Sequence, residues 1–229
     1  MVKMFFKRLY YTSSSSRFLR YLRNGGVKIG NDCIIRCPKT AFIDMTRPCL
    51  ITIGNHVDMN RYFQILTHDW ASSVFRNKYH EFINSSGKVT IGNNIYFGTN
   101  VTVLKGVTIG DNCIIGAHSL VTHDIPSNSV AAGVPCRVIC SLDDYFYKRK
   151  RCALDEAKEY IKSFRERFGR NPNASELGEE FIYFVNKENI SDYAEIPIKF
   201  QLGAGYDDWL KSHKSPFGSL DEFLNSIDD

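Results

Sequence analysis

Apolar residues between Val89 and Ile139 recur every six positions, a period that fits neither a helix nor an ordinary strand. The repeating positions are Ile91, Phe97, Val103, Ile109, Ile115 and Val121. Glycine follows the apolar residue in four of these six units, and Asn or Asp often comes next, which indicates turns with positive φ. This pattern predicts short strands, three to a coil, stacked into a parallel β-helix. Residues 18 apart then lie above one another, so Phe97 stacks under Ile115 and Thr99 under Ala117.

The same register begins earlier in the chain. Its apolar positions are Ile29, Ile35, Ala41, Ile53, Met59 and Ile65. Arg47 is the one residue at this register that is out of character. The 26 residues from Ile65 to Ile91 are not a multiple of six, so we expect residues 69–88 to form an inserted loop. A loop of this length inside a compact repeat is usually functional.

Helical patterns flank the repeat. Residues 1–24 contain six Lys or Arg and no acid, and Ser13–Ser16 offer an N-cap for a short basic amphipathic helix that ends at Gly25. This helix either covers the open end of the β-helix or touches an anionic membrane surface. After Ser141 the apolar spacing becomes three and four, which predicts an amphipathic helix that ends at Gly169.

Two further helices are predicted downstream. Asn173 or Ser175 would cap one of them, and a capping box from Ser219 to Glu222 would begin the other. The sequence therefore predicts a basic N-terminal segment (1–26), a β-helix domain (27–140) with its loop insertion (69–88), and a helical C-terminal extension (141–229) whose role is open.

Charge is spread unevenly along the chain, although the net charge is only +4. Residues 1–140 have a net charge of +9, and residues 141–229 have a net charge of −5. A basic repeat half suits an anionic ligand such as coenzyme A or a sugar nucleotide, and an ordinary basic surface explains the charge equally well. The acidic extension argues against a nucleic-acid partner.

The seven cysteines form no C-x-x-C pair and no zinc signature, which favours a reducing cytoplasm and no metal. Lys7 and Arg8 interrupt the first apolar run before a signal-peptide core could form, and we find no other apolar stretch of about 20 residues. We therefore expect a cytoplasmic protein. Peripheral membrane contact through the basic N-terminus stays open.

The run from Ile95 to Ile139 resembles the C-terminal coils of the hexapeptide-repeat acyltransferases, in the branch of the maltose, galactoside and polysaccharide O-acetyltransferases. Its closing motif, AAGVPCRVI, is especially diagnostic. The resemblance implies a mainly β protein with a left-handed parallel β-helix, a homotrimer, and acetyl-CoA as the acyl donor. It also implies that the loop at 69–88 projects over a neighbouring subunit and helps to wall the acceptor site.

The resemblance also places the catalytic histidine at His68, immediately before the loop. A sugar hydroxyl is a poor nucleophile, and an imidazole can accept its proton during attack on a thioester. No nucleophilic Ser or Cys elbow is visible, so we expect direct transfer without an acyl-enzyme. A carboxylate or carbonyl should orient the second ring nitrogen, and Asp69 and Glu81 are the candidates.

Donor-binding residues follow from the same match. Tyr96 stands where the family has Trp, and Gly98, Thr99, Gly116 and Ala117 surround the thioester and pantetheine groove. Further along, the residues expected nearer the nucleotide and its 3′-phosphate are Thr122, His123 and Arg137. His123 stands where Lys is usual, and Cys140 where a basic residue is common, so the phosphate contact departs from the family pattern.

We therefore predict an acetyl-CoA-dependent O-acetyltransferase that acts on a hydroxyl of a sugar, a surface polysaccharide or its precursor. N-acetylation of an amino sugar nucleotide is the close alternative. A metal hydratase like the γ-class carbonic anhydrases is a weaker one, because His118 and His123 have the spacing of two ligands but Lys105 stands where a third is needed. A non-catalytic trimeric scaffold is a further alternative. The sequence does not identify the acceptor.

Overall fold

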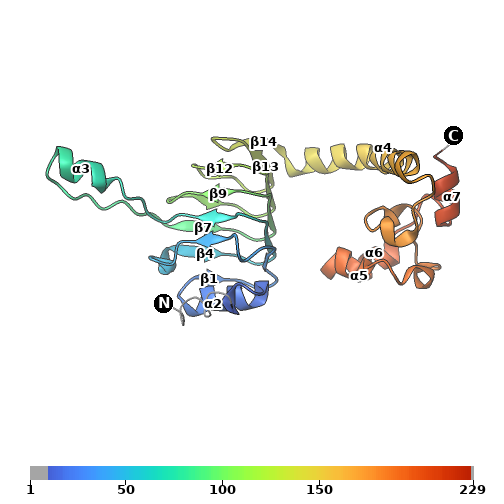
Figure 1. The fold of residues 1–229 in the computed structure, drawn as a ribbon, viewed down its shortest axis with the longest axis horizontal. Helices are drawn as coiled ribbons and strands as arrows, with labels where there is room; N and C mark the ends of the chain where they lie inside the picture. Colours follow the sequence, from blue (N-terminus) through green and yellow to red (C-terminus); the bar gives the residue numbers. More distant parts are fainter. Residues whose placement is uncertain (1–9, 228–229) are drawn as a thin grey trace. The chain divides into compact units, whose positions relative to one another are not determined.

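The structure is a computed structural model that describes residues 10–227. The chain divides into two compact units, of which the first ends at Phe146 and the second begins at Tyr147. Each unit has its own hydrophobic core. The first unit contains the six-residue repeat, and the second contains most of the helical extension (Figure 1).

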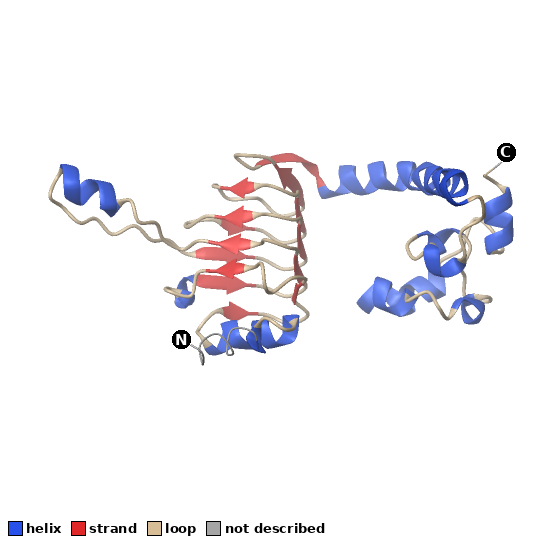
Figure 2. Ribbon diagram, viewed as in Figure 1, coloured by secondary structure: helices blue, strands red, loops and turns tan. Residues whose placement is uncertain are grey.

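The first unit is a parallel β-helix in which successive coils add short strands to three sheets (Figure 2). The first sheet contains β1 (Lys28–Ile29), β4 (Ile51–Ile53), β7 (Val89–Ile91) and β10 (Thr108–Ile109). The second sheet contains β2 (Ile34–Ile35), β5 (Val57–Met59), β8 (Ile95–Phe97), β11 (Cys113–Ile115), β13 (Ser129–Ala132) and β14 (Arg137–Ser141). The third sheet contains β3 (Phe42–Ile43), β6 (Gln64–Ile65), β9 (Thr102–Val103) and β12 (Leu120–Val121). Neighbouring coils pair in parallel, and β14 turns back antiparallel on β13.

The six-residue repeat sets the register from β7 onward. Phe97 pairs with Ile115 and Val103 pairs with Val121, so residues 18 apart lie above one another as predicted. These four side chains are completely buried. Because burial of one such side chain contributes roughly 1.5–3 kcal/mol, the inward stack accounts for much of the stability of the β-helix.

The first coil is longer than the six-residue register predicts. Its third strand buries Ile43, whereas the register placed Ala41 at that position, so the prediction for this strand is wrong by two residues. A turn in which the Thr40 N–H donates to the Cys37 carbonyl adds the two residues. A 3-10 helix, η1 (Pro48–Leu50), then lengthens the passage to β4. Arg47 therefore lies outside the inward register.

Glycine is needed where successive turns approach closely. A Cβ atom added at Gly92 would lie 2.8 Å from the carbonyl carbon of Gly110 in the next coil. Two residues further on, Asn94 and Asn112 both have a φ of 56°, and the Asn94 side chain donates a 2.9 Å hydrogen bond to that of Asn112. The recurrent glycine thus permits close stacking, and the asparagine tolerates the left-handed turn.

A short helix, α2 (Ser15–Asn24), packs at the N-terminal end of the β-helix (Figure 2). Ser14 is its N-cap, accepting a hydrogen bond from the Arg17 N–H, and Gly25 is its C-cap. Phe18, Leu19 and Leu22 belong to the same buried core as the repeat, so the helix covers the open end. Lys3, Lys7 and Arg8 lie outside the described residues. Within residues 10–227 no helix is long and apolar enough to cross a membrane.

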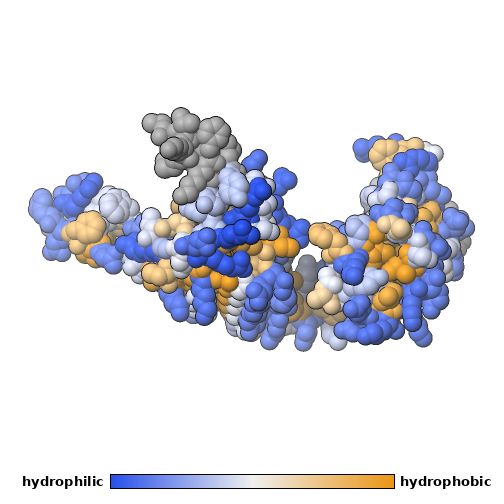
Figure 3. Space-filling view, turned by 90° about the horizontal axis from the view of Figure 1, so that it is seen from below, coloured by the Kyte–Doolittle hydropathy of each residue, from blue (hydrophilic) through white to orange (hydrophobic). Residues whose placement is uncertain are grey.

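Residues 69–88 form an arm that extends away from the β-helix and contains α3 (Ser72–Lys78) (Figure 1). At its base, the Asp69 carboxylate accepts hydrogen bonds from the Ser85 hydroxyl (2.8 Å) and the Lys105 ammonium. The Gly87 N–H donates to the Thr67 carbonyl (2.9 Å), so both ends of the arm are held against the β-helix. Apolar side chains on the arm, including Val74, Tyr79 and Phe82, are exposed, and apolar surface is visible there in Figure 3.

The second unit packs helices and turns around a separate apolar core. Its helices and 3-10 turns are α4 (Leu142–Phe168), which begins in the first unit, η2 (Ala174–Glu176), η3 (Glu180–Tyr183), η4 (Ile190–Tyr193), α5 (Ile198–Leu202), η5 (Gly203–Gly205), α6 (Tyr206–Ser212) and α7 (Leu220–Asn225). The helix predicted after Asn173 is wrong in type, because short 3-10 turns stand there. The Asn173 cap itself is present, with a full capping box to Glu176. Ser219 caps α7 by accepting from the Glu222 N–H.

Candidate functional site

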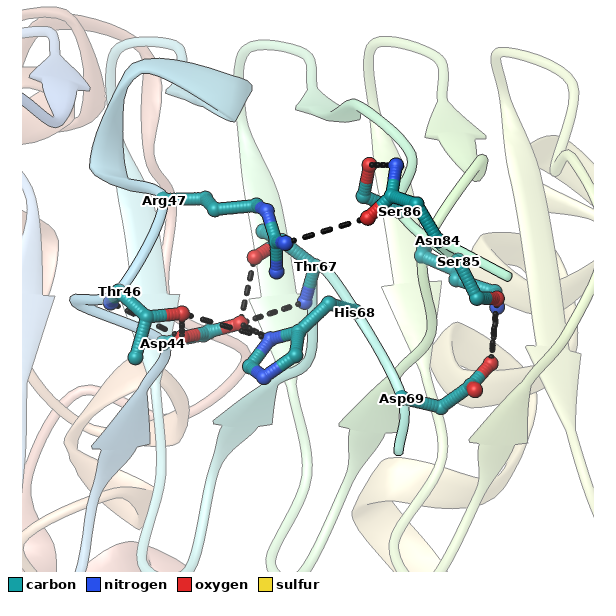
Figure 4. Close-up of polar contacts among 10 residues, drawn as sticks. Asp44, Thr46, Arg47, Thr67, His68, Asp69, Asn84, Ser85 and Ser86 are labelled. Atoms are coloured by element: carbon teal, nitrogen blue, oxygen red, sulfur yellow. Dashed lines mark hydrogen bonds and ion pairs between the residues drawn. The ribbon is translucent and has the colours of Figure 1, made fainter. Parts of the chain in front are cut away.

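His68 and Asp44 form a polar pair at the corner between the third and first sheets. Both residues follow strands of the third sheet, and the pairing of Ile43 with Ile65 brings the two segments together. One Asp44 carboxylate oxygen, Oδ2, lies 2.6 Å from His68 Nδ1 (Figure 4). The Asp44 side chain is 3% exposed and the His68 side chain is 28% exposed. The carboxylate is therefore buried behind an imidazole that faces solvent.

Two threonines hold the Asp44 carboxylate in place. The Thr46 hydroxyl (2.6 Å) and the Thr46 N–H (3.0 Å) donate to Oδ1, and the Thr67 N–H (3.2 Å) and the Thr67 hydroxyl donate to Oδ2. Burial by itself would raise the pKa of Asp44, but the hydrogen bonds from Thr46, Thr67 and His68 outweigh it and hold the pKa well below its usual range. The carboxylate is thus ionised and fully hydrogen-bonded at neutral pH.

The carboxylate at His68 is thus neither of the two that the sequence suggested. Asp69 points to Lys105, Ser85 and the Ala71 N–H, and these contacts, with Lys105 the largest, lower its pKa. Glu81 lies exposed on the arm. Asp44 is 24 residues before His68, across a coil lengthened at η1, so no local pattern connects the two residues.

A small pocket opens beside His68 at the base of the arm. Its lining residues are Arg47, His68, Asp69, Trp70, Ser72, Phe82, Ile83, Asn84 and Ser85. Trp70 and Phe82 pack edge to face, with ring centroids 5.8 Å apart, and are 62% and 65% exposed. The Arg47 guanidinium donates to the Asn84 side-chain oxygen at 3.3 Å (Figure 4). The pocket therefore combines an apolar wall with a cation and an amide.

The residues predicted to bind the donor fall into two groups. Gly98, Thr99, Gly116 and Ala117 lie at the corner after the second sheet, beside the exposed ring of Tyr96, whose hydroxyl accepts a 3.4 Å hydrogen bond from Asn60. The turns at this corner are tightly stacked, since a Cβ at Gly98 would lie 2.5 Å from the Ala117 nitrogen.

The second group lies near the C-terminal end of the β-helix. The Thr122 hydroxyl lies 2.8 Å from His123 Nδ1, and Arg137 lies 3.5 Å from the same ring nitrogen. Thr122 and His123 follow β12, so they share the third-sheet corner with His68. Within one chain the structure thus places His68 and the Thr99–Ala117 turns at different corners.

Five residues around His68 were not identified from the sequence as site residues: Asp44, Arg47, Trp70, Phe82 and Asn84. Because Arg47 does not fit the apolar register of the repeat, its position could have indicated a site residue. For Trp70, Phe82 and Asn84, their place in the inserted loop was the only hint, and no signal in the sequence pointed to Asp44.

Metal-binding clusters are not found in the described part of the chain, where no three His, Cys, Asp or Glu residues are grouped to hold an ion. His118 contacts Asn100 across the turn after the second sheet, and His123 stands at the third-sheet corner. Within the chain, the two histidines considered for a hydratase therefore do not meet.

The stacked six-residue coils are typical of a class of bacterial transferases. The family model for bacterial transferase hexapeptide (six repeats) matches residues 88–123. Protein CapG of Staphylococcus aureus is 36% identical over 188 residues, which are 82% of this chain and 96% of CapG. The chain belongs to the hexapeptide-repeat acyltransferase family, in the branch of the maltose, galactoside and polysaccharide O-acetyltransferases, and the expected left-handed β-helix is confirmed.

Two other relatives illustrate the extent of the match. Galactoside O-acetyltransferase of Escherichia coli (strain K12) is 42% identical over 107 residues, so the matched part spans 43% of this chain and 49% of that protein. Among solved structures, a maltose O-acetyltransferase from Clostridium difficile 630 is 29% identical, covering 58% of this chain and 81% of that chain with a TM-score of 0.41.

Proposed function

We propose that this protein transfers an acetyl group from acetyl-CoA to a hydroxyl of a sugar, either in a surface polysaccharide or in its precursor. The observation that carries the proposal is the His68–Asp44 pair beside the pocket at the base of the arm. The exposed rings of Trp70 and Phe82 offer an apolar wall to the face of a sugar ring. Galactoside O-acetyltransferase, which is named for a sugar acceptor, is among the relatives of the chain.

His68 acts as the general base in this proposal. Ionised Asp44 can only accept hydrogen bonds, so it stabilises the tautomer in which Nδ1 carries the proton and Nε2 has a free lone pair. Nε2 takes the proton of the acceptor hydroxyl as its oxygen attacks the thioester carbonyl. The carbon–sulfur bond then breaks, and the imidazolium returns the proton to the departing thiolate. Asp44 is a positioning residue that also stabilises the transient imidazolium.

Direct transfer is preferred because the hydroxyls in the pocket are already engaged. The Ser72 hydroxyl donates to the Ile83 carbonyl and accepts from the Ile83 N–H. The Ser85 hydroxyl contacts Asp69 and Lys105. Neither serine contacts His68, so neither is activated as a nucleophile.

The separation of the two corners supports a trimer with sites between subunits. His68 at one corner and the Thr99–Ala117 turns at another cannot hold donor and acceptor together in a single chain. Three β-helices packed side by side would bring the His68 corner of one subunit to the donor corner of the next. Sedimentation equilibrium tests this arrangement, and a fully active monomer would refute it.

Contact of the N-terminal segment with anionic membranes stays a prediction that rests on Arg17, Arg20 and Arg23, which are exposed on α2.

His68→Ala tests the chemistry. Loss of the base should lower kcat by about 100-fold or more, whereas the dissociation constant for acetyl-CoA should barely change. Thiol release in the presence of a panel of sugars measures the rate. His56→Asn is the matched control, because it removes an exposed imidazole from a different corner and should retain wild-type turnover. Wild-type turnover in His68→Ala would show that His68 is structural.

A further inference from the structure

Arg47 lies outside the inward register of the repeat and lines the pocket beside His68. It lies in the passage between Ile43 and Ile53, which has ten residues from one inward position to the next, where the corresponding passage from Val103 to Ile109 has six. The extra residues form η1, and Arg47 precedes it with φ −136° and ψ 59°. Its neighbour Thr46 donates to Asp44 and lies 3.4 Å from His68 Nδ1. The coil expansion thus places a cation in the same pocket as the proposed base.

The charge of Arg47 has no counter-ion within the described chain. Asp44 is surrounded by Thr46, Thr67 and His68, and Asp69 is paired with Lys105. Among residues 10–227 no carboxylate forms an ion pair with Arg47, and its hydrogen bond to Asn84 uses one of five guanidinium N–H groups. A half-buried guanidinium with free donors is suited to a planar anion.

Two other arginines, one in the β-helix and one in the extension, differ in this respect. Arg36 donates to both oxygens of Asp58, and Arg170 donates to both oxygens of Glu176. Each of these two guanidinium groups therefore already forms an ion pair with a carboxylate of the same chain. Arg47 instead lines the pocket, together with the amide of Asn84 and the apolar wall of Trp70 and Phe82.

We propose that Arg47 selects acceptors that carry an anionic group, so that the natural acceptor is an acidic sugar bearing a carboxylate or a phosphate. The anion accepts hydrogen bonds from the free guanidinium N–H groups while the hydroxyl to be acetylated lies at His68. This inference rests on the proposed acetyl transfer for its context, but the binding preference can be measured without catalysis. A carboxylate on the sugar ring and a phosphate ester present the same charge and are separated by the choice of probe.

The test compares three probes on the full-length protein: methyl β-D-galactopyranoside, the corresponding methyl galacturonide, and galactose 1-phosphate. Ligand-observed NMR gives dissociation constants, and thiol release from acetyl-CoA gives kcat/KM where turnover occurs. One anionic probe should bind about 10- to 100-fold more tightly than the neutral one, as expected for a charge-assisted hydrogen bond. Which probe shows the preference tells a carboxylate acceptor from a phosphate acceptor.

Variants then assign the preference to Arg47. Arg47→Gln should reduce the ratio of anionic to neutral affinity to near one, and Arg47→Lys should retain only part of it, since a point charge lacks the planar fork. Arg61→Gln, which changes an exposed arginine of the β-helix outside the pocket, is the matched control and should preserve the ratio.

Equal binding of neutral and anionic probes by the wild type would overturn the proposal. So would a uniform loss of affinity for all three probes in Arg47→Gln, which is the result expected if Arg47 only fastens the arm through Asn84. Failure of the catalytic proposal looks different. In that case His68→Ala keeps its turnover while the anionic preference and its loss in Arg47→Gln remain.

Discussion

Replacement of Asp44 by Asn is the sharpest test of how the fold prepares His68. The exchange keeps the shape of the side chain but removes its charge and introduces two N–H donors. All the hydrogen-bonding partners of the carboxylate donate to it in the present arrangement: Thr46, Thr67 and His68. An amide in this position must direct its N–H groups at some of those donors. Either a buried contact is lost, or His68 changes tautomer.

The size of the effect follows from the contact that is lost. A hydrogen bond to an ionised partner contributes about 1.5–3 kcal/mol. At about 1.4 kcal/mol for each factor of ten, kcat should fall roughly 10- to 100-fold. If the amide N–H₂ faces His68 Nδ1, the proton moves to Nε2 and the base is lost altogether, so the decrease approaches that of His68→Ala. The affinity for acetyl-CoA should be unchanged, because Asp44 contacts none of the predicted donor residues.

The assay is thiol release as a function of pH, with Asp58→Asn as the control. Asp58 is a carboxylate on the second sheet of the same β-helix, ion-paired with Arg36 and remote from the pocket, so its loss should change kcat less than twofold. Because the hydrogen bonds hold the pKa of Asp44 well below its usual range, Asp44 stays ionised between pH 5 and 8. A loss of activity on the acidic side of that window therefore does not come from protonation of Asp44.

Stability provides a second readout for Asp44→Asn. A carboxyl whose pKa is lowered in the folded state contributes stability above its ordinary pKa of 3.8, and this contribution is lost as the pH falls further. The Asn variant should therefore be less stable at neutral pH, by about 1–3 kcal/mol for the mismatched buried donors. Kinetics should be measured well below its unfolding temperature. Wild-type kcat/KM with an unchanged pH profile would refute the role of Asp44.

Three further outcomes are expected. Gly92→Ala should destabilise the β-helix by about 1–3 kcal/mol because its Cβ would meet Gly110, whereas Gly178→Ala, where no atom lies within 4 Å, should have little effect in urea unfolding. Burial lowers the pKa of His213 despite its 2.8 Å hydrogen bond to the Ile182 carbonyl. Protonation of His213 therefore favours unfolding, and the second unit should lose stability below about pH 6.5. The His213→Gln variant should not show this loss. The measurement is hydrogen exchange as a function of pH, and the same pH dependence in the wild type and the variant would contradict the prediction. Ala117→Trp should raise the KM for acetyl-CoA about tenfold or more with the fold intact, since Ala117 is exposed, and an unchanged KM would place the donor groove elsewhere.

The repeat shows how far the sequence alone determines this protein. Each face of a coil buries an apolar residue at the repeat position, so the six-residue period is visible in the sequence and predicts the stack of Phe97 under Ile115. The same local logic located α2, because Ser14 and Gly25 act on groups within one turn of themselves. The closing motif indicated the family, and the break in the repeat predicted the inserted loop. The prediction of His68 before that loop came from the family resemblance.

Tertiary structure decided which residues meet at that histidine. Asp44 and His68 come together because the third strands of two successive coils pair, and their separation depends on the passage through η1, whose length the period does not encode. The earlier turn at Cys37–Thr40 places Ile43 at the inward position, and Arg47, just before η1, lines the pocket. After Asn173, the helical spacing was satisfied by 3-10 turns, because packing around Leu177 and Phe181 outweighed local propensity. Periodic burial is a local property that a sequence displays, whereas contacts across coils depend on chain path and appear only in the folded structure.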